Sequence, residues 1–353
     1  MNLISELNDM PITPVPTNKK ATGNHTPKVA ILDDYARVAL DLADWSPVQN
    51  RADVTVFDRH LSEDEAVEAL QSFDVVCTLR ERMAFPRTLI ERLPNLKLMT
   101  IVGMSLTNLD MAAASECGVL VAHPNFANPG FAAAGNGVPE LAWGLMMATV
   151  RNLAEEHRRM REGGWQATVG MTLHGKTLGL LGLGRLGKRM NEYAKVFGMK
   201  VIAWSQNLTD EAAATAGVRR VEKETLFKEA DVISIGLVLS ERTRGLVAAP
   251  ELALMKPSAY LINISRGPIV DEAALIAALR AGRIAGAGLD VYDVEPLPSD
   301  HPLRSLPNVT LSPHLGYVTR ELLSVVYSDT VEAVAAWLDG KPVRIVNREA
   351  LQH

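Results

Sequence analysis

Short apolar runs alternate with amphipathic runs along most of this chain. From Lys28 onward, apolar runs typical of buried strands begin near residues 28, 53, 73, 97 and 118. Helix-type runs lie between them, among them EDEAVEALQ from Glu63 and LDMAAASECG from Leu109. Strands separated by helices in this rhythm predict a parallel sheet covered by helices. We therefore expect a first α/β domain that ends near Asn128.

A second alternating series begins at Thr177. Its six strand candidates start at residues 177, 200, 231, 259, 284 and 308, and most are followed by a helix-type run such as DEAALIAALRAG. Six strands with helical crossovers predict a complete dinucleotide-binding sheet of the Rossmann type. The linker PNFANPGFAAAGNG before this series has the composition of a loop, and one long apolar helix is predicted after it, from about Val138 to about Glu162.

The last predicted helix, from about Arg320 to about Asp339, follows a cofactor sheet that is already complete. We expect this segment to return to the first domain, which leaves a cleft between the two domains. The predicted fold class is α/β with two doubly wound parallel sheets, a Rossmann domain being inserted into a split, flavodoxin-like substrate domain. The predicted boundaries are a flexible tail over 1–27, a substrate domain over 28–128 plus 317–348, and a dinucleotide-binding domain over 129–316.

A glycine cluster lies where the first strand of the second series meets a helix. Gly182, Gly184 and Gly187 have the G-x-G-x-x-G spacing, in which the first glycine permits the turn, the second lets a pyrophosphate approach and the third lets helix and strand pack closely. Backbone amides at the start of the helix would then face the phosphates. A turn without a ligand is the alternative, and the flanking strand and helix favour the dinucleotide.

Three side chains with complementary chemistry follow three successive strands of this series. Arg266 comes after the fourth strand, Glu295 after the fifth and His314 after the sixth. Because ligands bind outside the carboxyl ends of parallel strands, all three are expected on the edge that carries the glycine turn. Taken singly, the arginine could cap a turn, the glutamate could be a surface acid and the histidine could be structural. His123 and His301 follow no strand of the cofactor sheet, and we interpret both as structural.

Each of the three side chains suits one task in carbonyl reduction or its reverse. An arginine fork can hold a substrate carboxylate and polarise the neighbouring keto oxygen. A histidine exchanges protons near neutral pH and can protonate that oxygen. A glutamate bonded to the far ring nitrogen would fix the tautomer and favour the imidazolium. The hydride must come from a cofactor.

The segments LGLLGLGRLG, MKPSAYLINISRGPIVDEAALIAALRAGRIAGAGLDVYDVEPLP and HPLRSLPNVTLSPHLG resemble the D-isomer-specific 2-hydroxyacid dehydrogenases, and the resemblance covers nearly the whole chain from Lys28. It implies an NAD(P)-dependent enzyme that interconverts a small 2-keto acid, for example glyoxylate or hydroxypyruvate, and its D-2-hydroxy acid. It assigns the catalytic roles to Arg266 in SRG, Glu295 in DVEP and His314 in PHLG. It also implies a homodimer through the long helix near Trp143.

The resemblance further implies the cofactor contacts. Asp290 in GLDVY would hold the nicotinamide carboxamide, Arg185 and Leu186 would contact the pyrophosphate, and Ile264 and Ser205 complete the predicted set. Ser205 stands where NAD-specific proteins usually carry an acid that bonds the ribose. No nearby arginine replaces it to clamp a 2′-phosphate. The choice between NAD(H) and NADP(H) therefore stays open, with NAD(H) somewhat favoured.

The substrate contacts depart from the family pattern. In IVGMSLTN only Gly103 remains of the usual G-x-G loop, and Val238 replaces the proline of an L-P-L-T-type run. Backbone amides near Gly103 and Met104, with Arg80 in TLRERMAF, are the candidates for the substrate carboxylate, although Arg80 could equally form a surface salt bridge. The identity of the 2-hydroxy acid and the physiological direction cannot be read from the sequence.

Composition and charge limit the possible partners, the roles of the cysteines and the location of the protein. The formal net charge is −5, which argues against nucleic acid or an anionic membrane as partner. Cys77 and Cys117 lack metal or redox spacing, so we predict two buried free thiols and no metal site. Residues 1–27 contain no signal-peptide pattern and no apolar run is long enough to span a membrane, so the expected location is the cytoplasm.

Two alternative functions remain open. A formate or phosphite dehydrogenase belongs to the same broad family, but formate enzymes of this type have glutamine as the partner of the histidine, and Glu295 disfavours them. A cofactor-sensing protein such as a transcriptional corepressor would bind the dinucleotide without turnover. It would also need a peptide groove, which the sequence does not indicate.

Overall fold

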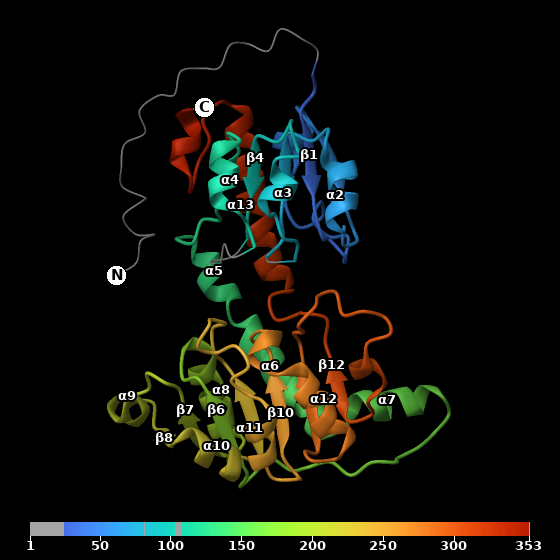
Figure 1. Cartoon of the computed structure of the whole chain (residues 1–353), viewed down its shortest axis with the longest axis vertical. Coiled ribbons are helices and arrows are strands. Elements are labelled where there is room, and N and C mark those ends of the chain that lie inside the picture. The colour runs from blue at the N-terminus through green and yellow to red at the C-terminus, as the bar shows by residue number, and fades with distance from the viewer. Residues whose placement is uncertain (1–24, 81, 103–107, 353) are drawn as a thin grey trace. The chain divides into compact units, whose positions relative to one another are not determined.

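The chain forms two parallel sheets, each in its own compact unit (Figure 1). The computed structural model describes residues 25–80, 82–102 and 108–352. The first unit consists of the described residues up to Ala134 together with those from Arg320, and the second unit extends from Gly135 to Thr319. Among the described residues, no helix is both long and apolar enough to cross a membrane.

The first unit contains a five-stranded parallel sheet in the order β2-β1-β3-β4-β5. Its strands are β1 Lys28–Ile31, β2 Asp53–Val56, β3 Val75–Cys77, β4 Leu98–Thr100 and β5 Leu120–Ala122. Its helices are α1 Ser46–Gln49, α2 Glu63–Leu70, α3 Arg87–Ile90, α4 Met111–Glu116, α5 Pro129–Ala134 and α13 Arg320–Leu338, followed by the 3₁₀ helix η3 Arg348–Gln352. Helix α2 begins at a capping box in which Ser62 and Glu65 satisfy each other's backbone amides.

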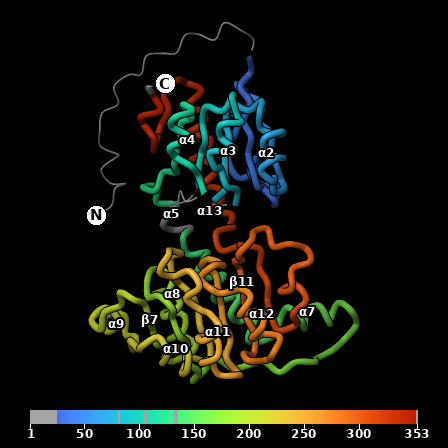
Figure 2. Tube along the Cα trace, viewed as in Figure 1, coloured from blue at the N-terminus to red at the C-terminus, as the bar shows by residue number. Residues whose placement is uncertain are grey.

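The carboxyl-terminal segment belongs to this first unit. Helix α13 packs against α1, α5 and β4, and Figure 2 traces it in red among the blue and cyan segments of the unit. Ile345 then forms a bridge to Ala122, and the side-chain oxygen of Asn347 accepts the amide proton of Val121 (2.8 Å). The segment therefore extends the sheet of the first unit at β5.

The second unit contains a seven-stranded parallel sheet in the order β12-β11-β10-β9-β6-β7-β8. Its strands are β6 Thr177–Leu181, β7 Lys200–Trp204, β8 Arg219–Arg220, β9 Val232–Ile235, β10 Tyr260–Asn263, β11 Gly286–Leu289 and β12 Val309–Leu311. Its helices are α6 Gly137–Val150, α7 Leu153–Arg161, α8 Arg185–Val196, α9 Asp210–Thr215, α10 Lys223–Glu229, α11 Ala249–Leu254 and α12 Glu272–Arg280, with the 3₁₀ helices η1 Gly267–Ile269 and η2 Pro302–Ser305.

Two apolar cores cover the two faces of this sheet. One joins the strands to α6, α8 and α9 through side chains such as Leu145 and Met190. The other joins them to α10, α11 and α12 through side chains such as Phe227 and Leu275. Because every residue of β9 is buried, its sequence (VISI) is mostly apolar on both faces of the sheet. The predicted fold class, with two helix-covered parallel sheets, is confirmed.

Two local predictions are wrong, and one strand was missed. The long helix predicted from Val138 to Glu162 is broken between α6 and α7, because Asn152 adopts a left-handed conformation (φ 51°) that ends the hydrogen-bond ladder. The linker predicted as a loop contains α5, which begins at Pro129 after Asn128 accepts the amide proton of Gly130. Strand β8 was not predicted, because its two arginines give no apolar signal.

The prediction for the two thiols is half right. Cys77 lies in β3 and is buried, and burial raises the pKa of its thiol to about 12. Cys117 is exposed at the carboxyl end of α4, which contradicts the prediction. The apolar residues around Cys117 belong to the helix and to β5, and the cysteine itself lies in the turn between them. The predicted flexible tail over 1–27 falls outside the described residues except for 25–27.

Candidate active site

The glycine turn between β6 and α8 has the geometry that dinucleotide binding requires. Gly182 has φ 103°, and a side chain there would lie 2.6 Å from the carbonyl of Gly236. A Cβ on Gly187 would lie 2.2 Å from the carbonyl of Gly182, whereas a Cβ on Gly184 would meet nothing within 4 Å. The first and third glycines are thus needed by the fold, and the open space at Gly184 suits the approach of a ligand.

The start of α8 leaves its amide groups available to an anion. Gly184 is the N-cap residue, no side chain caps the helix and no acid lies in its first turn. Arg185 is exposed and Leu186 is half-buried in that turn. An uncapped helix start beside a glycine turn provides backbone donors and a positive dipole end for a pyrophosphate. These residues therefore fit the dinucleotide that the sequence predicts.

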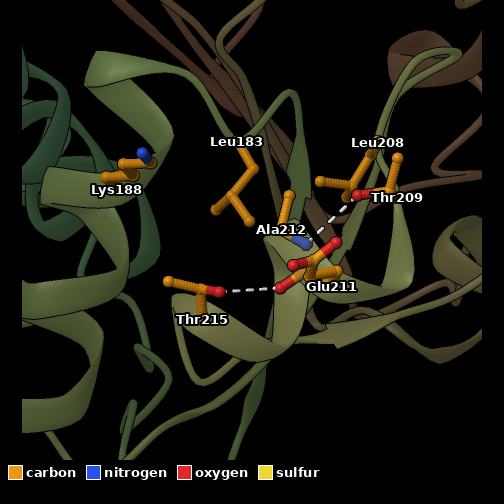
Figure 3. Close-up of a pocket in the computed structure, with 7 residues that line it drawn as sticks. All are labelled: Leu183, Lys188, Leu208, Thr209, Glu211, Ala212 and Thr215. Carbon is orange, nitrogen blue, oxygen red and sulfur yellow. Dashed lines mark hydrogen bonds between the residues drawn. The ribbon is translucent and has the colours of Figure 1, made fainter.

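A pocket of about 370 Å³ lies beside this turn (Figure 3). Leu183 and Lys188 line it from the glycine turn and α8, and Leu208, Thr209, Glu211, Ala212 and Thr215 line it from the segment around α9. Ser205 starts the same segment, since its carbonyl accepts the amide proton of Leu208 (3.1 Å). The pocket is therefore next to the position where the ribose contact is predicted, and none of Arg266, Glu295 and His314 lines it.

Glu295 and His314 meet directly. Strands β11 and β12 are neighbours in the sheet, and the segments after them bring Glu295 Oε2 within 2.5 Å of His314 Nδ1. The other carboxylate oxygen, Oε1, accepts the amide proton of Tyr292 (2.9 Å). Both side chains are mostly buried, with exposed fractions of 18% for His314 and 27% for Glu295. This bond orients the ring and engages Nδ1, so Nε2 is the ring atom left for a substrate.

Arg266 lies on the loop after β10, which packs against the loop of Glu295. A Cβ on Gly267 would lie 2.0 Å from the carbonyl carbon of Tyr292, so only glycine allows the two loops to approach this closely. Asn263 holds the loop from within, because its amide donates to the carbonyl of Arg266 (3.0 Å) and its oxygen accepts the amide proton of Ser265 (3.1 Å). The half-buried guanidinium donates to the carbonyl of Ser265 (2.7 Å). Ile264, in the same loop, is buried.

Asp290 lies directly after β11 and is buried at 1% exposure. Its carboxylate accepts hydrogen bonds from the hydroxyl of Ser312 (2.6 Å) and from the amides of Leu315 (2.8 Å) and Gly316 (3.0 Å). Burial raises the pKa of Asp290, while these hydrogen bonds and the nearby His314 act in the opposite direction. The family resemblance implies a cofactor contact for Asp290, and its hydrogen bonds in the structure lead to the segment of His314.

Two residues near the site were not predicted. Tyr292 is buried, and its hydroxyl lies within hydrogen-bond distance of the carbonyls of Ser312 (2.9 Å) and Leu289 (3.0 Å). Ser312 provides the hydroxyl that Asp290 accepts. Both lie inside motifs that carry predicted residues, but only the adjacency of β11 and β12 brings them together. Nothing in the sequence alone signals that contact.

The remaining candidates are Arg80, Gly103 and Met104 for the substrate, and the two histidines interpreted as structural. Arg80, in the first unit, has φ 60° and lines a narrow recess with Thr78 and Asn108. Gly103 and Met104 lie outside the described residues. His301 bonds Glu272 (3.0 Å), and His123 stacks on Phe126, as expected of structural histidines. Among the described residues, no group of histidine, cysteine or acidic side chains could hold a metal ion.

Comparisons with known proteins place this chain in a class of oxidoreductases. Residues 143–316 match the model of the family described as D-isomer specific 2-hydroxyacid dehydrogenase, NAD binding domain. The chain is 36% identical over 274 residues to a glyoxylate reductase from Aeropyrum pernix, which covers 75% of this chain and 80% of the relative. It is 36% identical over 292 residues to a hydroxypyruvate reductase from Thermotoga maritima, which covers 81% of this chain and 92% of the relative.

A solved structure agrees with these relatives. The structure of a phosphoglycerate oxidoreductase from Vibrio cholerae superposes with a TM-score of 0.82 at 34% identity and covers 89% of this chain and 99% of that one. The chain spans about half the length of the curated D-3-phosphoglycerate dehydrogenases that it also matches. The class is therefore that of NAD(P)-dependent oxidoreductases with two α/β domains. Within that class, this chain belongs to the D-isomer specific 2-hydroxyacid dehydrogenase family, as the sequence predicted.

Proposed function

We propose that this protein reduces a small 2-keto acid to its D-2-hydroxy acid, and catalyses the reverse reaction, with glyoxylate and hydroxypyruvate as candidate substrates. The observation that carries the proposal is the 2.5 Å bond between His314 Nδ1 and Glu295 Oε2 on the edge of the sheet that also carries the glycine turn. The glyoxylate reductase and hydroxypyruvate reductase among its relatives support the choice of substrates.

His314 is the proton donor in this proposal. In reduction, Nε2 gives its proton to the keto oxygen while C2 accepts a hydride, so the carbonyl becomes a hydroxyl. The hydride is the chemistry that a bound nicotinamide supplies. Glu295 keeps the ring oriented and balances its positive charge before the proton leaves. In the oxidation direction the neutral ring takes the proton back from the hydroxyl.

Arg266 is proposed to hold the substrate carboxylate. Asn263 and the close approach of Gly267 to Tyr292 fix its loop, so the backbone that carries the guanidinium is held in place. A guanidinium fork binds a carboxylate through two parallel bonds and so orients the keto group beside it. We assign further substrate contacts to the first unit, with Arg80 and the backbone near Gly103 and Met104 as candidates, and cofactor contacts to the second.

NAD(H) is the proposed cofactor. No arginine lines the pocket beside the glycine turn, and Glu211 contributes a carboxylate to its wall opposite the single cation of Lys188. Arg220, on β8, donates to the carbonyl of Leu208 (2.9 Å) and lies near the carboxylates of Asp210 and Glu222. A 2′-phosphate would therefore gain little charge compensation here. NADP(H) is the alternative cofactor, and a comparison of NADH with NADPH oxidation distinguishes the two.

A homodimer is proposed through α7 and the segment after it. Helix α7 has no buried residue, and Leu153, Met160, Trp165 and Val169 are all more than half exposed. Trp143 packs on Tyr193 and Phe197 within its own unit. Exposed apolar side chains of this size are candidates for a contact with a second copy of the chain. Sedimentation should show a dimer at micromolar concentration and a shift toward monomer in Trp165→Glu, and a wild-type monomer would contradict this proposal.

The function is tested by oxidation of NADH and NADPH in parallel with a panel of 2-keto acids. The panel contains glyoxylate, hydroxypyruvate, pyruvate and 3-phosphohydroxypyruvate, and formate and phosphite are tested with NAD⁺. We expect turnover of at least one small 2-keto acid, a D-configured product and a preference for NADH. Cofactor binding without turnover on any 2-keto acid would favour a sensing protein, and cofactor reduction by phosphite or formate alone would replace the proposed reaction.

A further inference from the structure

The segment that carries His314 is tied at both ends to one buried carboxylate. Asp290 Oδ1 accepts the hydroxyl proton of Ser312 (2.6 Å) and the amide proton of Leu315 (2.8 Å), and Oδ2 accepts the amide proton of Gly316 (3.0 Å). His314 lies between these donors in sequence. Asp290 and Ser312 are almost fully buried, at 1% and 8% exposure, so water does not replace these bonds easily.

The backbone of His314 needs this support. Its φ is 54°, a left-handed conformation that side chains other than glycine adopt rarely. Successive amides that follow a left-handed residue form a concave pair of donors that fits an anion. The carboxylate of Asp290 fills this position at Leu315 and Gly316. The turn that presents the imidazole is thus stabilised by a charge on the neighbouring strand.

The same segment is also fixed to the loop of Glu295. The hydroxyl of Tyr292 lies 2.9 Å from the carbonyl of Ser312, and the amide of Tyr292 donates to Glu295 Oε1 (2.9 Å). Ser312 is therefore held through its hydroxyl by Asp290 and through its carbonyl by Tyr292. Both contacts lead from β11 to the residues just before His314. They define where the imidazole lies relative to Glu295.

We propose that Asp290 and Ser312 are positioning residues for His314, which hold its left-handed turn so that Nδ1 stays on Glu295 and Nε2 faces the substrate. This inference rests on the proposed function, because it takes His314 as the proton donor. It differs from the role that the family resemblance implies for Asp290, a contact with the nicotinamide carboxamide. A carboxylate has about four acceptor positions, and bonds within the protein take three of them.

The test compares Ser312→Ala, Ser312→Thr and Asp290→Asn with the wild-type enzyme, and Ser305→Ala serves as the matched surface control. Loss of the hydroxyl should lower kcat about tenfold. The Asp290→Asn variant should lower kcat about 100-fold, because in either orientation its NH2 group replaces an acceptor oxygen and faces a backbone N–H donor. Ser312→Thr should restore kcat. The dissociation constant for NADH should stay within about twofold in the Ser312 variants, because Ser312 acts on the turn.

A second readout needs no substrate. The proton shared by His314 Nδ1 and Glu295 should give a downfield NMR signal in the wild type, identified by its loss in His314→Ala. We expect the signal to disappear or broaden in Ser312→Ala and Asp290→Asn and to persist in Ser312→Thr and Ser305→Ala. If Asp290→Asn does not fold, the comparison of Ser312→Ala with Ser312→Thr is sufficient to test whether the hydroxyl holds the His314 turn.

The outcomes separate this inference from the proposed function. Wild-type kcat and an unchanged signal in Ser312→Ala would overturn it. It would also be overturned if Ser312→Ala and Asp290→Asn bind NADH more weakly while kcat at saturating NADH and the NMR signal stay normal. Asp290 would then act on the cofactor. If the wild type reduces no 2-keto acid, the proposed function fails, and the NMR comparison still decides whether Asp290 and Ser312 hold the His314 turn.

Discussion

His314 combines a reactive side chain with a backbone conformation that costs about 1–2 kcal/mol for a residue with a side chain. Such strain persists only where the surroundings hold it, and it is frequent at functional sites. Here the surroundings are the 2.5 Å bond to Glu295 and the bonds from Leu315 and Gly316 to Asp290.

The role of the Arg266 guanidinium can be tested with a single substitution. Replacing it with lysine keeps the charge but removes the two parallel donors, so kcat/KM for the 2-keto acid should fall about 100-fold. Arg189→Lys is the control, because Arg189 is an exposed residue paired with Glu192 on α8. Steady-state kinetics of both variants provide the comparison. An unchanged kcat/KM in Arg266→Lys would mean that another residue orients the acid.

At the scale of elements, the turn between β6 and α8 separates what the fold needs from what the ligand needs. In Gly187→Ala the new Cβ would lie 2.2 Å from the carbonyl of Gly182, so we expect the free energy of unfolding to fall by about 1–3 kcal/mol. In Gly184→Ala the new Cβ meets open space, so the melting temperature should hold while NADH binds at least about tenfold more weakly. Equal melting temperatures for the two variants would contradict these roles.

Asp231 joins the starts of β6 and β9 and gives this sheet an acid-sensitive contact. Burial raises the pKa of Asp231, but Lys256 (2.9 Å) and the amide of Thr177 (2.8 Å) lower it more, so the net pKa lies below its ordinary value. The contribution to stability is therefore complete above the unfolded-state pKa of about 4 and is lost as the pH falls through the folded-state pKa.

Denaturant unfolding between pH 3 and pH 7 measures this dependence. The free energy of unfolding of the wild type should fall below about pH 4, and Asp231→Asn should show a shallower fall than the exposed control Asp300→Asn. An identical pH profile for the two variants would show that Asp231 contributes nothing to the acid sensitivity.

Helices and strands could be predicted from the sequence where apolar runs are long and buried. They could be predicted less well where a tertiary contact or a single backbone conformation decides the structure. The strands β6, β9 and β10 are mostly apolar and mostly buried, and the sequence predicts them. The arginines of β8 form a strand only because β7 offers its edge. The break at Asn152 depends on one left-handed residue inside a sequence with uniform helical character. Such features are set by tertiary contacts more than by local propensity.

For the whole molecule, topology explains which parts of the candidate site could be predicted. Parallel strands bring their carboxyl ends to one edge, so Arg266, Glu295 and His314 could be chosen from the residues that follow three strands. The bond between Glu295 and His314 follows from the neighbouring positions of β11 and β12. Ser312 and Tyr292 could not be chosen, because their importance lies in hydrogen bonds that form only after these strands pair.

The measurement that tests the central claim most directly is single-turnover oxidation of bound NADH by the wild type and by His314→Ala with the best 2-keto acid of the panel. We predict that the rate falls at least about 1,000-fold in the variant while the dissociation constant for NADH stays within about twofold. A rate near that of the wild type in a folded variant that binds NADH would contradict the assignment of His314 as the proton donor, and with it the proposed active site.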